Sequence, residues 1–155
     1  MLKKICVLGL GYIGLPTAAM FAEQGHEVIG VDVNETIVHL LNEGRIHIEE
    51  KGLEDLVKKA IKNGKLRAAT SPEFADVFVI AVPTPIYADH TANLQYLEEA
   101  TRSIIPYVNN HNIVIVESTI PPRTMDDIIA PIFRNAGWDV GNDLFLAHCP
   151  ERVLP

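Results

Sequence analysis

The chain has 155 residues, of which 13 are Lys or Arg and 20 are Asp or Glu, so its formal net charge is −7. This length predicts one domain with a sizeable core. No Lys/Arg cluster interrupts the acidic balance, so we expect no nucleic-acid partner. The two cysteines, Cys6 and Cys149, lie in strand-like runs without zinc-type spacing. They predict reduced, buried thiols and no metal site.

The N-terminal segment joins an apolar strand, a glycine-rich turn, a helical pattern and a second strand. The apolar run 5–8 leads directly into G-x-G-x-x-G, and the second strand, 27–31, is followed by Asp32. The three glycines of the motif are Gly9, Gly11 and Gly14. This order and spacing is typical of a βαβ unit that binds a dinucleotide.

Each glycine of the motif has its own expected role. Gly9 permits a tight turn, Gly11 lets a pyrophosphate approach the backbone, and Gly14 lets the helix pack closely on the strand. The diphosphate would then meet free N–H groups at a helix N-terminus, beside Tyr12 and Ile13. Asp32 would accept hydrogen bonds from a ribose and repel a 2′-phosphate, which predicts NAD rather than NADP.

Residues 5–22 carry no charge and follow Lys3 and Lys4, so they superficially resemble a signal peptide or a short membrane span. The glycine spacing and Pro16 argue against a continuous apolar helix. Residues 23–26 end the segment as a helix stop rather than a cleavage site. We therefore expect a cytoplasmic protein without a membrane partner.

Strands and helices continue to alternate after Asp32. Asn34 can cap a helix with an apolar face of Ile37, Leu40 and Leu41, and a second helical stripe runs over 53–61. A short strand is expected at 66–69. Ser71, Pro72 and Glu73 then predict a single helical turn, because Ser is a good cap and Pro suits the first helical position.

The second half repeats the alternation. We predict strands over 77–82, 113–116 and 144–147, and helices over 94–105 and 124–136. The 77–82 strand is apolar on both faces, as in the middle of a parallel sheet covered by helices on both sides. The whole pattern predicts a single α/β domain with a Rossmann-type, doubly wound, mostly parallel sheet. Ligands of such sheets bind beyond the carboxyl ends of the strands. Those ends are residues 9–14, Asp32, 82–84, 117–119 and 148–152.

Five motifs in order also resemble a known family. They are GLGYIGLP at 9–16, the run from LNEG at 41–44 to IEEKGL at 48–53, VPTP at 82–85, ESTIP at 117–121 and CPERVLP at 149–155. Together they resemble the UDP-glucose/GDP-mannose dehydrogenase family over the whole chain. The last motif is most similar to the branch that oxidises UDP-N-acetylmannosamine, because the UDP-glucose branch usually has Pro-Glu-Phe-Leu there.

The resemblance implies an enzyme that oxidises the sixth-carbon hydroxyl of a nucleotide sugar to a carboxylate with two NAD molecules, through a covalent cysteine adduct. Residues 1–155 would be its NAD-binding domain. A dimerising helical region and a UDP-sugar-binding domain would follow, and the second of these would supply the nucleophilic cysteine and a lysine. On this interpretation the chain is a fragment of a homodimeric enzyme that binds NAD without turning over substrate.

The cofactor-binding and substrate-binding residues follow from the strand ends and from the resemblance. For NAD they are Gly9, Gly11, Tyr12, Ile13, Gly14, Asp32, Val33, Val82, Pro83, Thr84, Ser118 and Thr119. The resemblance implies that Thr119 orients water near the nicotinamide and that Glu151 is a general base. Thr119 could instead cap a helix beginning at Pro121. Arg152 and Val153, with Glu151, would lie along the bound sugar.

Two departures from the family pattern bear on the site. Arg123 stands where the family commonly has Gly, which predicts the loss of a conformation with positive φ. Pro155 stands where the UDP-glucose branch has a second glutamate.

Two other functions remain open from the sequence. One is the cofactor domain of a β-hydroxyacid dehydrogenase or imine reductase, which would need its own helical domain and catalytic lysine. The other is a stand-alone module for NAD sensing or protein interaction. Neither cysteine is expected to be a nucleophile, because no lysine neighbours either one in sequence to lower its pKa.

Overall fold

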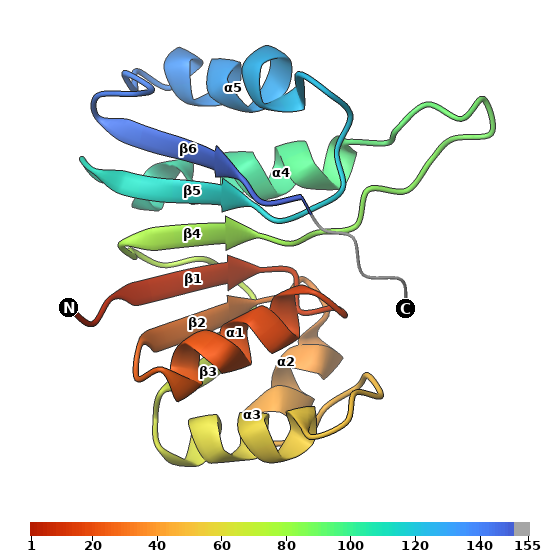
Figure 1. Ribbon diagram of the computed structural model, residues 1–155, viewed down its shortest axis with the longest axis vertical. Helices are drawn as coiled ribbons and strands as arrows, with labels where there is room; N and C mark the ends of the chain where they lie inside the picture. Colours follow the sequence, from red (N-terminus) through yellow and green to blue (C-terminus); the bar gives the residue numbers. More distant parts are fainter. Residues whose placement is uncertain (151–155) are drawn as a thin grey trace.

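The computed structural model describes residues 1–150 and confirms the Rossmann-type α/β fold. Six strands form one sheet in the order β3-β2-β1-β4-β5-β6, and every pairing is parallel. The strands are β1 (Lys4–Leu8), β2 (Glu27–Val31), β3 (Leu66–Ala69), β4 (Val77–Ile80), β5 (Asn112–Val116) and β6 (Leu144–His148). The arrows of β1, β4, β5 and β6 point the same way in Figure 1, and because every pairing is parallel the carboxyl ends of all the strands share one edge.

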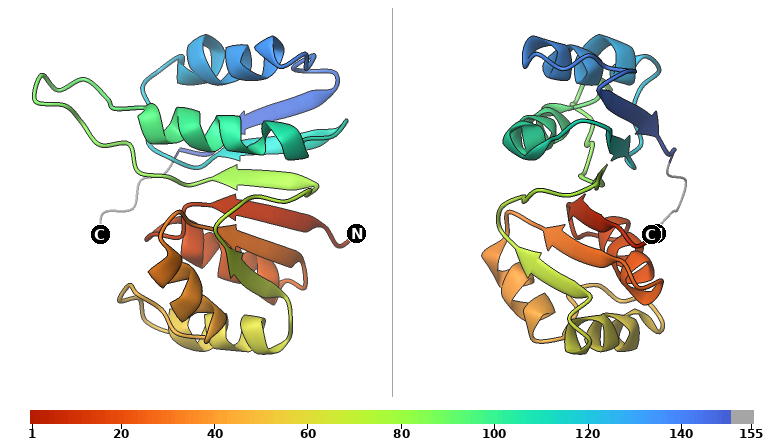
Figure 2. Two further views of the ribbon diagram at one scale, coloured as in Figure 1. Left: turned by 180° about the vertical axis from the view of Figure 1, so that it is seen from behind. Right: turned by 90° about the vertical axis from the view of Figure 1, so that its left-hand side faces the viewer.

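Helices connect each strand to the next, except between β3 and β4, and they cover the sheet. They are α1 (Gly14–Glu23), α2 (Glu35–Asn42), α3 (Leu53–Lys62), α4 (Gln95–Ile104), a 3₁₀ turn (Ile105–Tyr107), a π-helical segment (Met125–Ile129) and α5 (Ala130–Asn135). Figure 2 shows α1 and α3 on one side of the sheet and α4 on the other. No helix within residues 1–150 is long and apolar enough to cross a membrane.

The buried side chains of β1 show why both faces are covered. Ile5 and Val7 pack in the cluster that includes α1 and α3, whereas Cys6 and Leu8 pack in the cluster that includes α4 and α5. Successive side chains of a strand point to opposite faces, so a strand buried on both sides must be continuously apolar. The direction of winding changes between β1 and β4, which places the ligand-binding switch point of the fold beside the glycine-rich turn.

The expected helical turn at Ser71–Glu73 is wrong, because residues 70–76 form no helix. This segment leaves β3 at one end of the sheet and must pass both β2 and β1 to reach β4. Three strand spacings of about 4.8 Å, together with the return to the start of a parallel strand, require a nearly extended chain. Glu73 is instead used in side-chain pairing, with Arg67 and with Lys4.

Other boundaries differ by smaller amounts. The expected strand 77–82 ends at Ile80, and the expected helix 124–136 begins with a π-helical segment at Met125–Ile129. The prediction for α2 is confirmed in detail, because the Asn34 side chain accepts a hydrogen bond from the Thr36 amide at 3.0 Å.

Candidate dinucleotide-binding site

The turn after β1 requires glycine at two positions for reasons within the fold itself. Gly9 has φ 86°, and a Cβ added to it would lie 2.5 Å from the carbonyl oxygen of Ala81. A Cβ added to Gly14 would overlap the carbonyl oxygen of Gly9 and press on the Ala81 side chain. The turn, the first residue of α1 and the end of β4 therefore pack backbone against backbone, as expected for Gly9 and Gly14.

Gly11 differs from its two neighbours in the motif. A Cβ added there would meet no heavy atom within 4 Å, so the fold itself imposes no need for glycine. A close approach by a ligand would explain the residue, which is the role expected for Gly11. Helix α1 begins just beyond it, with no side-chain cap at Ile13 and no acidic residue in its first turn. This helix end therefore suits an anion.

The Asp32 carboxylate is held by the backbone of two neighbouring segments. One oxygen accepts a hydrogen bond from the Leu10 amide at 2.9 Å, and the other accepts from the Asn34 amide at 2.9 Å. Each carboxylate oxygen keeps further acceptor capacity, so both remain able to bind ribose hydroxyls. Val33, the next residue, is 94% exposed at this edge of the sheet.

Hydrogen bonds join the segments that follow β4 and β5. The Ser118 hydroxyl donates to the Val82 carbonyl at 2.8 Å, and the Thr84 hydroxyl donates to the Thr119 carbonyl at 2.6 Å. His148 Nε2 lies 3.2 Å from the Ser118 carbonyl oxygen, so the end of β6 also contacts the segment that follows β5. The predicted residues from these two segments thus lie together at the carboxyl edge.

The sequence did not predict one contact across this edge. The Thr17 hydroxyl in α1 donates a hydrogen bond to Glu117 Oε2 at 2.9 Å, although the residues are 100 positions apart. The sequence placed Glu117 at a strand end but gave it no role, and it gave no signal for Thr17. Only the packing of α1 against the sheet brings the two side chains together.

The segment after β5 corrects two expectations. The helix that Thr119 could cap does not begin at Pro121 but at Met125, with Thr124 in the N-cap position. The capping interpretation of Thr119 is therefore wrong. Arg123 also keeps the positive φ that its side chain was expected to remove, because its φ is 70°.

Arg123 forms a bidentate ion pair with Asp127, with N···O distances of 2.6 and 2.9 Å. The adjacent guanidinium holds the pKa of the Asp127 carboxyl below its usual range. This pair partly offsets the backbone cost of a left-handed non-glycine residue.

The two cysteines have different environments, so the prediction of two buried thiols is half wrong. Cys6 is fully buried in β1, and burial raises the pKa of its thiol to about 12. Cys149 is exposed, because it follows the end of β6 at the border of the sheet. Glu151, Arg152 and Val153 lie outside the described residues.

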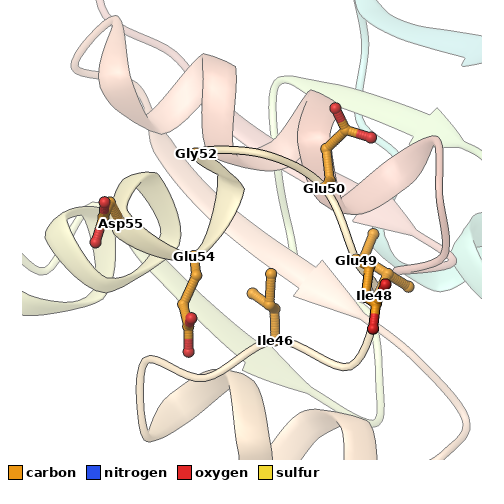
Figure 3. A pocket seen from close by; sticks show the side chains of 7 residues that line it. All are labelled: Ile46, Ile48, Glu49, Glu50, Gly52, Glu54 and Asp55. Carbon is orange, nitrogen blue, oxygen red and sulfur yellow. The ribbon is translucent and has the colours of Figure 1, made fainter.

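Two surface cavities occur away from the predicted site. One, of about 500 Å³, lies beside the start of α4. The other, of about 420 Å³, lies between the segment after α2 and the start of α3. Figure 3 shows its acidic lining, with Glu49, Glu50, Glu54 and Asp55 around Ile46 and Ile48. Within residues 1–150, no group of three His, Cys, Asp or Glu side chains could hold a metal ion.

The all-parallel sheet, the glycine turn at its switch point and the anchored acid after β2 define a dinucleotide-binding domain. The model of the UDP-glucose/GDP-mannose dehydrogenase family, NAD binding domain, matches residues 3–155. The chain belongs to this family, and its cofactor is NAD.

Named relatives of high similarity cover nearly the whole chain. It is 51% identical to a UDP-N-acetyl-D-mannosamine dehydrogenase of Methanocaldococcus jannaschii, over 99% of this chain and 35% of the relative. It is 48% identical to one of Campylobacter jejuni, over 99% of this chain and 40% of the relative. The native structure of the UDP-N-acetyl-mannosamine dehydrogenase from Staphylococcus aureus has a TM-score of 0.95 and 48% identity, over 98% of this chain and 37% of that one. The chain thus spans little more than a third of the length of these proteins.

Proposed function

We propose that this chain is the cofactor-binding part of a UDP-N-acetylmannosamine 6-dehydrogenase. The reaction would convert UDP-N-acetylmannosamine to UDP-N-acetylmannosaminuronate, a four-electron oxidation that uses two NAD. The observation that carries the choice of sugar is the 51% identity to a UDP-N-acetyl-D-mannosamine dehydrogenase over 99% of this chain. The CPERVLP motif at 149–155 supports the same branch.

We assign to each part of the edge a role in holding NAD. Gly9, Gly11, Tyr12, Ile13 and Gly14 would receive the diphosphate at the start of α1. Asp32 and Val33 would hold the adenosine ribose, because they follow β2 on one side of the turn. The nicotinamide would then lie on the other side of the turn, against the residues that follow β4 and β5. These residues are Val82, Pro83, Thr84, Ser118 and Thr119.

Bound NAD supplies a hydride acceptor for the alcohol carbon of the sugar. We assign to Thr119 the orientation of a water molecule near the nicotinamide, by resemblance to the family. The same resemblance assigns the general base to Glu151 and contacts with the sugar to Arg152 and Val153.

A second residue set must complete the enzyme. Oxidation beyond the aldehyde requires a thiolate to hold it as a thiohemiacetal, from which a second hydride leaves. Cys6 is unsuited, because burial raises its thiol pKa to about 12. Cys149 is exposed and follows β6. By resemblance to the family, we assign the nucleophile not to Cys149 but to a further domain of a cytoplasmic homodimer, and we expect the 155-residue chain to bind NAD without turnover.

Calorimetric titration of the 155-residue chain with NAD and NADP tests the first half of the proposal. NAD is expected to bind and NADP to bind at least about tenfold more weakly, because Asp32 repels the 2′-phosphate. A preference for NADP would contradict the proposal.

The assay of the longer enzyme compares UDP-N-acetylmannosamine with UDP-glucose and counts the NADH formed per sugar. Two NADH per UDP-N-acetylmannosamine is the expected result, and faster oxidation of UDP-glucose would refute the choice of sugar. A natural stop codon directly after Pro155, together with tight NAD binding, would favour the stand-alone module.

A further inference from the structure

We propose that Glu117 makes this site bind oxidised NAD in preference to NADH. The inference rests on the proposed arrangement of NAD and extends it to the redox state of the cofactor. It starts from the contact between Thr17 and Glu117, which joins α1 to the end of β5.

Two hydrogen bonds hold Glu117 in place, one at its backbone amide and one at its side-chain carboxylate. Its amide donates to the Ile80 carbonyl at 2.8 Å, which holds the backbone against the end of β4. Its Oε2 accepts from the Thr17 hydroxyl at 2.9 Å, one turn into α1 from the glycine motif. The side chain therefore bridges β5 and the helix whose N-terminus receives the diphosphate. Glu117 is only partly exposed.

The fold determines which half of NAD meets this carboxylate. Asp32 follows β2 and so marks the adenosine side of the turn, whereas Glu117 follows β5 on the opposite side. A dinucleotide spread across the switch point places its nicotinamide on the second side. The two carboxylates of the edge thus act on opposite ends of the cofactor.

The two ends respond differently to reduction. The nicotinamide ring carries a positive charge in NAD⁺ and none in NADH, whereas the adenosine end does not change. A carboxylate on the nicotinamide side attracts the oxidised ring, and water screens this attraction only in part at a half-exposed position. Glu117 therefore lowers the dissociation constant of NAD⁺ relative to that of NADH, while Asp32 affects both forms equally. An enzyme that uses two NAD per sugar benefits, because each NADH must leave.

The test measures the dissociation constants of NAD⁺ and NADH on the purified protein and compares their ratio among variants. Glu117→Gln keeps an oxygen that can accept from Thr17 and removes the charge, so the preference for NAD⁺ should fall by about fivefold. Thr17→Val, which removes the hydrogen bond from Thr17 to this carboxylate, should lower the preference by a smaller factor, and Thr17→Ser should retain it. The wild-type preference should also shrink between low and high salt.

Two controls separate this charge effect from others. Glu54→Gln removes the same charge from the exposed start of α3 and should leave the ratio unchanged. Asp32→Asn should weaken the binding of both forms by the same factor. Failure of the wild-type protein to bind either form would refute the proposed function. Binding of both forms with a ratio that is unaltered by Glu117→Gln and by salt would overturn only the role of Glu117.

Discussion

The turn after β1 and the segment after β5 lie at the same edge of the sheet but are held by different means. Residues 9–14 are held mainly by the absence of side chains, because Gly9 and Gly14 pack against backbone atoms, and one bond from the Leu10 amide to Asp32 adds to this. Residues 117–124 are fixed by the presence of side chains, through the bonds of Glu117, Ser118 and Arg123. A steric requirement for glycine is visible in the sequence as the G-x-G-x-x-G motif. The side-chain hydrogen bonds that hold residues 117–124 have no such sequence motif.

The largest expected effect in this comparison is that of Gly14→Ala. The new methyl group would overlap the carbonyl oxygen of Gly9, and a backbone atom cannot move aside as a flexible side chain can. We expect the free energy of unfolding to fall by about 3 kcal/mol or more, as for a severe overpacking change. Urea denaturation measures this loss. An unchanged midpoint would show that the turn can accommodate a methyl group at Gly14, which would contradict the expected overlap with the Gly9 carbonyl oxygen.

Gly11→Ala separates the demands of the fold from those of the cofactor within the same turn. Because a Cβ at Gly11 meets nothing within 4 Å, the free energy of unfolding should change by less than about 0.5 kcal/mol. The dissociation constant of NAD should rise by about tenfold or more, since the methyl group occupies the side from which the diphosphate approaches. Parallel denaturation and calorimetry test the pair of outcomes. Normal NAD affinity in this variant would place the diphosphate elsewhere.

Ser118→Ala tests the bonded segment. It removes the hydroxyl that donates to the Val82 carbonyl from a residue that is only 5% exposed. Loss of this buried hydrogen bond should cost about 1 kcal/mol of unfolding free energy. The matched variant Thr84→Val removes the more exposed bond to Thr119 and should cost less. Equal losses would indicate that burial does not determine the strength of these two links.

Arg123→Gly should give the smallest change in stability, and it should stabilise the protein, whereas Gly14→Ala and Ser118→Ala destabilise it. Glycine accepts the φ of 70° without strain, while the lost pair with Asp127 is exposed to solvent. A slight rise in the thermal unfolding midpoint is expected, and Arg123→Ala, which keeps the strain and loses the pair, should lower it.

The ion pair between Arg123 and Asp127 also makes the stability difference between Arg123→Gly and the wild type depend on pH. Because Arg123 lowers the pKa of Asp127, the contribution of the pair is complete above the ordinary value of 3.8 and is lost as the pH falls through the lowered value. The advantage of Arg123→Gly over the wild type should therefore grow in acid. An advantage that stays constant down to acid pH would argue against the pair.

The sequence predicted most of the fold and the segments that meet at the carboxyl edge of the sheet, where the candidate site lies. The positions of the strands, the glycine turn, the acid at Asp32 and the Asn34 cap depend on local spacing and on the apolar pattern, which are visible in the chain. The helical turn at Ser71 was wrong, because the position of β4 beyond β1 overrides a local capping preference. The Thr17–Glu117 contact and the left-handed Arg123 depend on tertiary packing, which local patterns do not encode.

Asp32 ties the end of β2 to the glycine turn, because the oxygen beside the Leu10 amide supports the peptide on which the diphosphate would lie. Removal of the negative charge at this position is the direct way to admit a 2′-phosphate. In this chain, replacement of Asp32 by a neutral residue would also withdraw the support of Leu10. A change of coenzyme would therefore need a compensating acceptor for that amide, in addition to a cation for the extra phosphate.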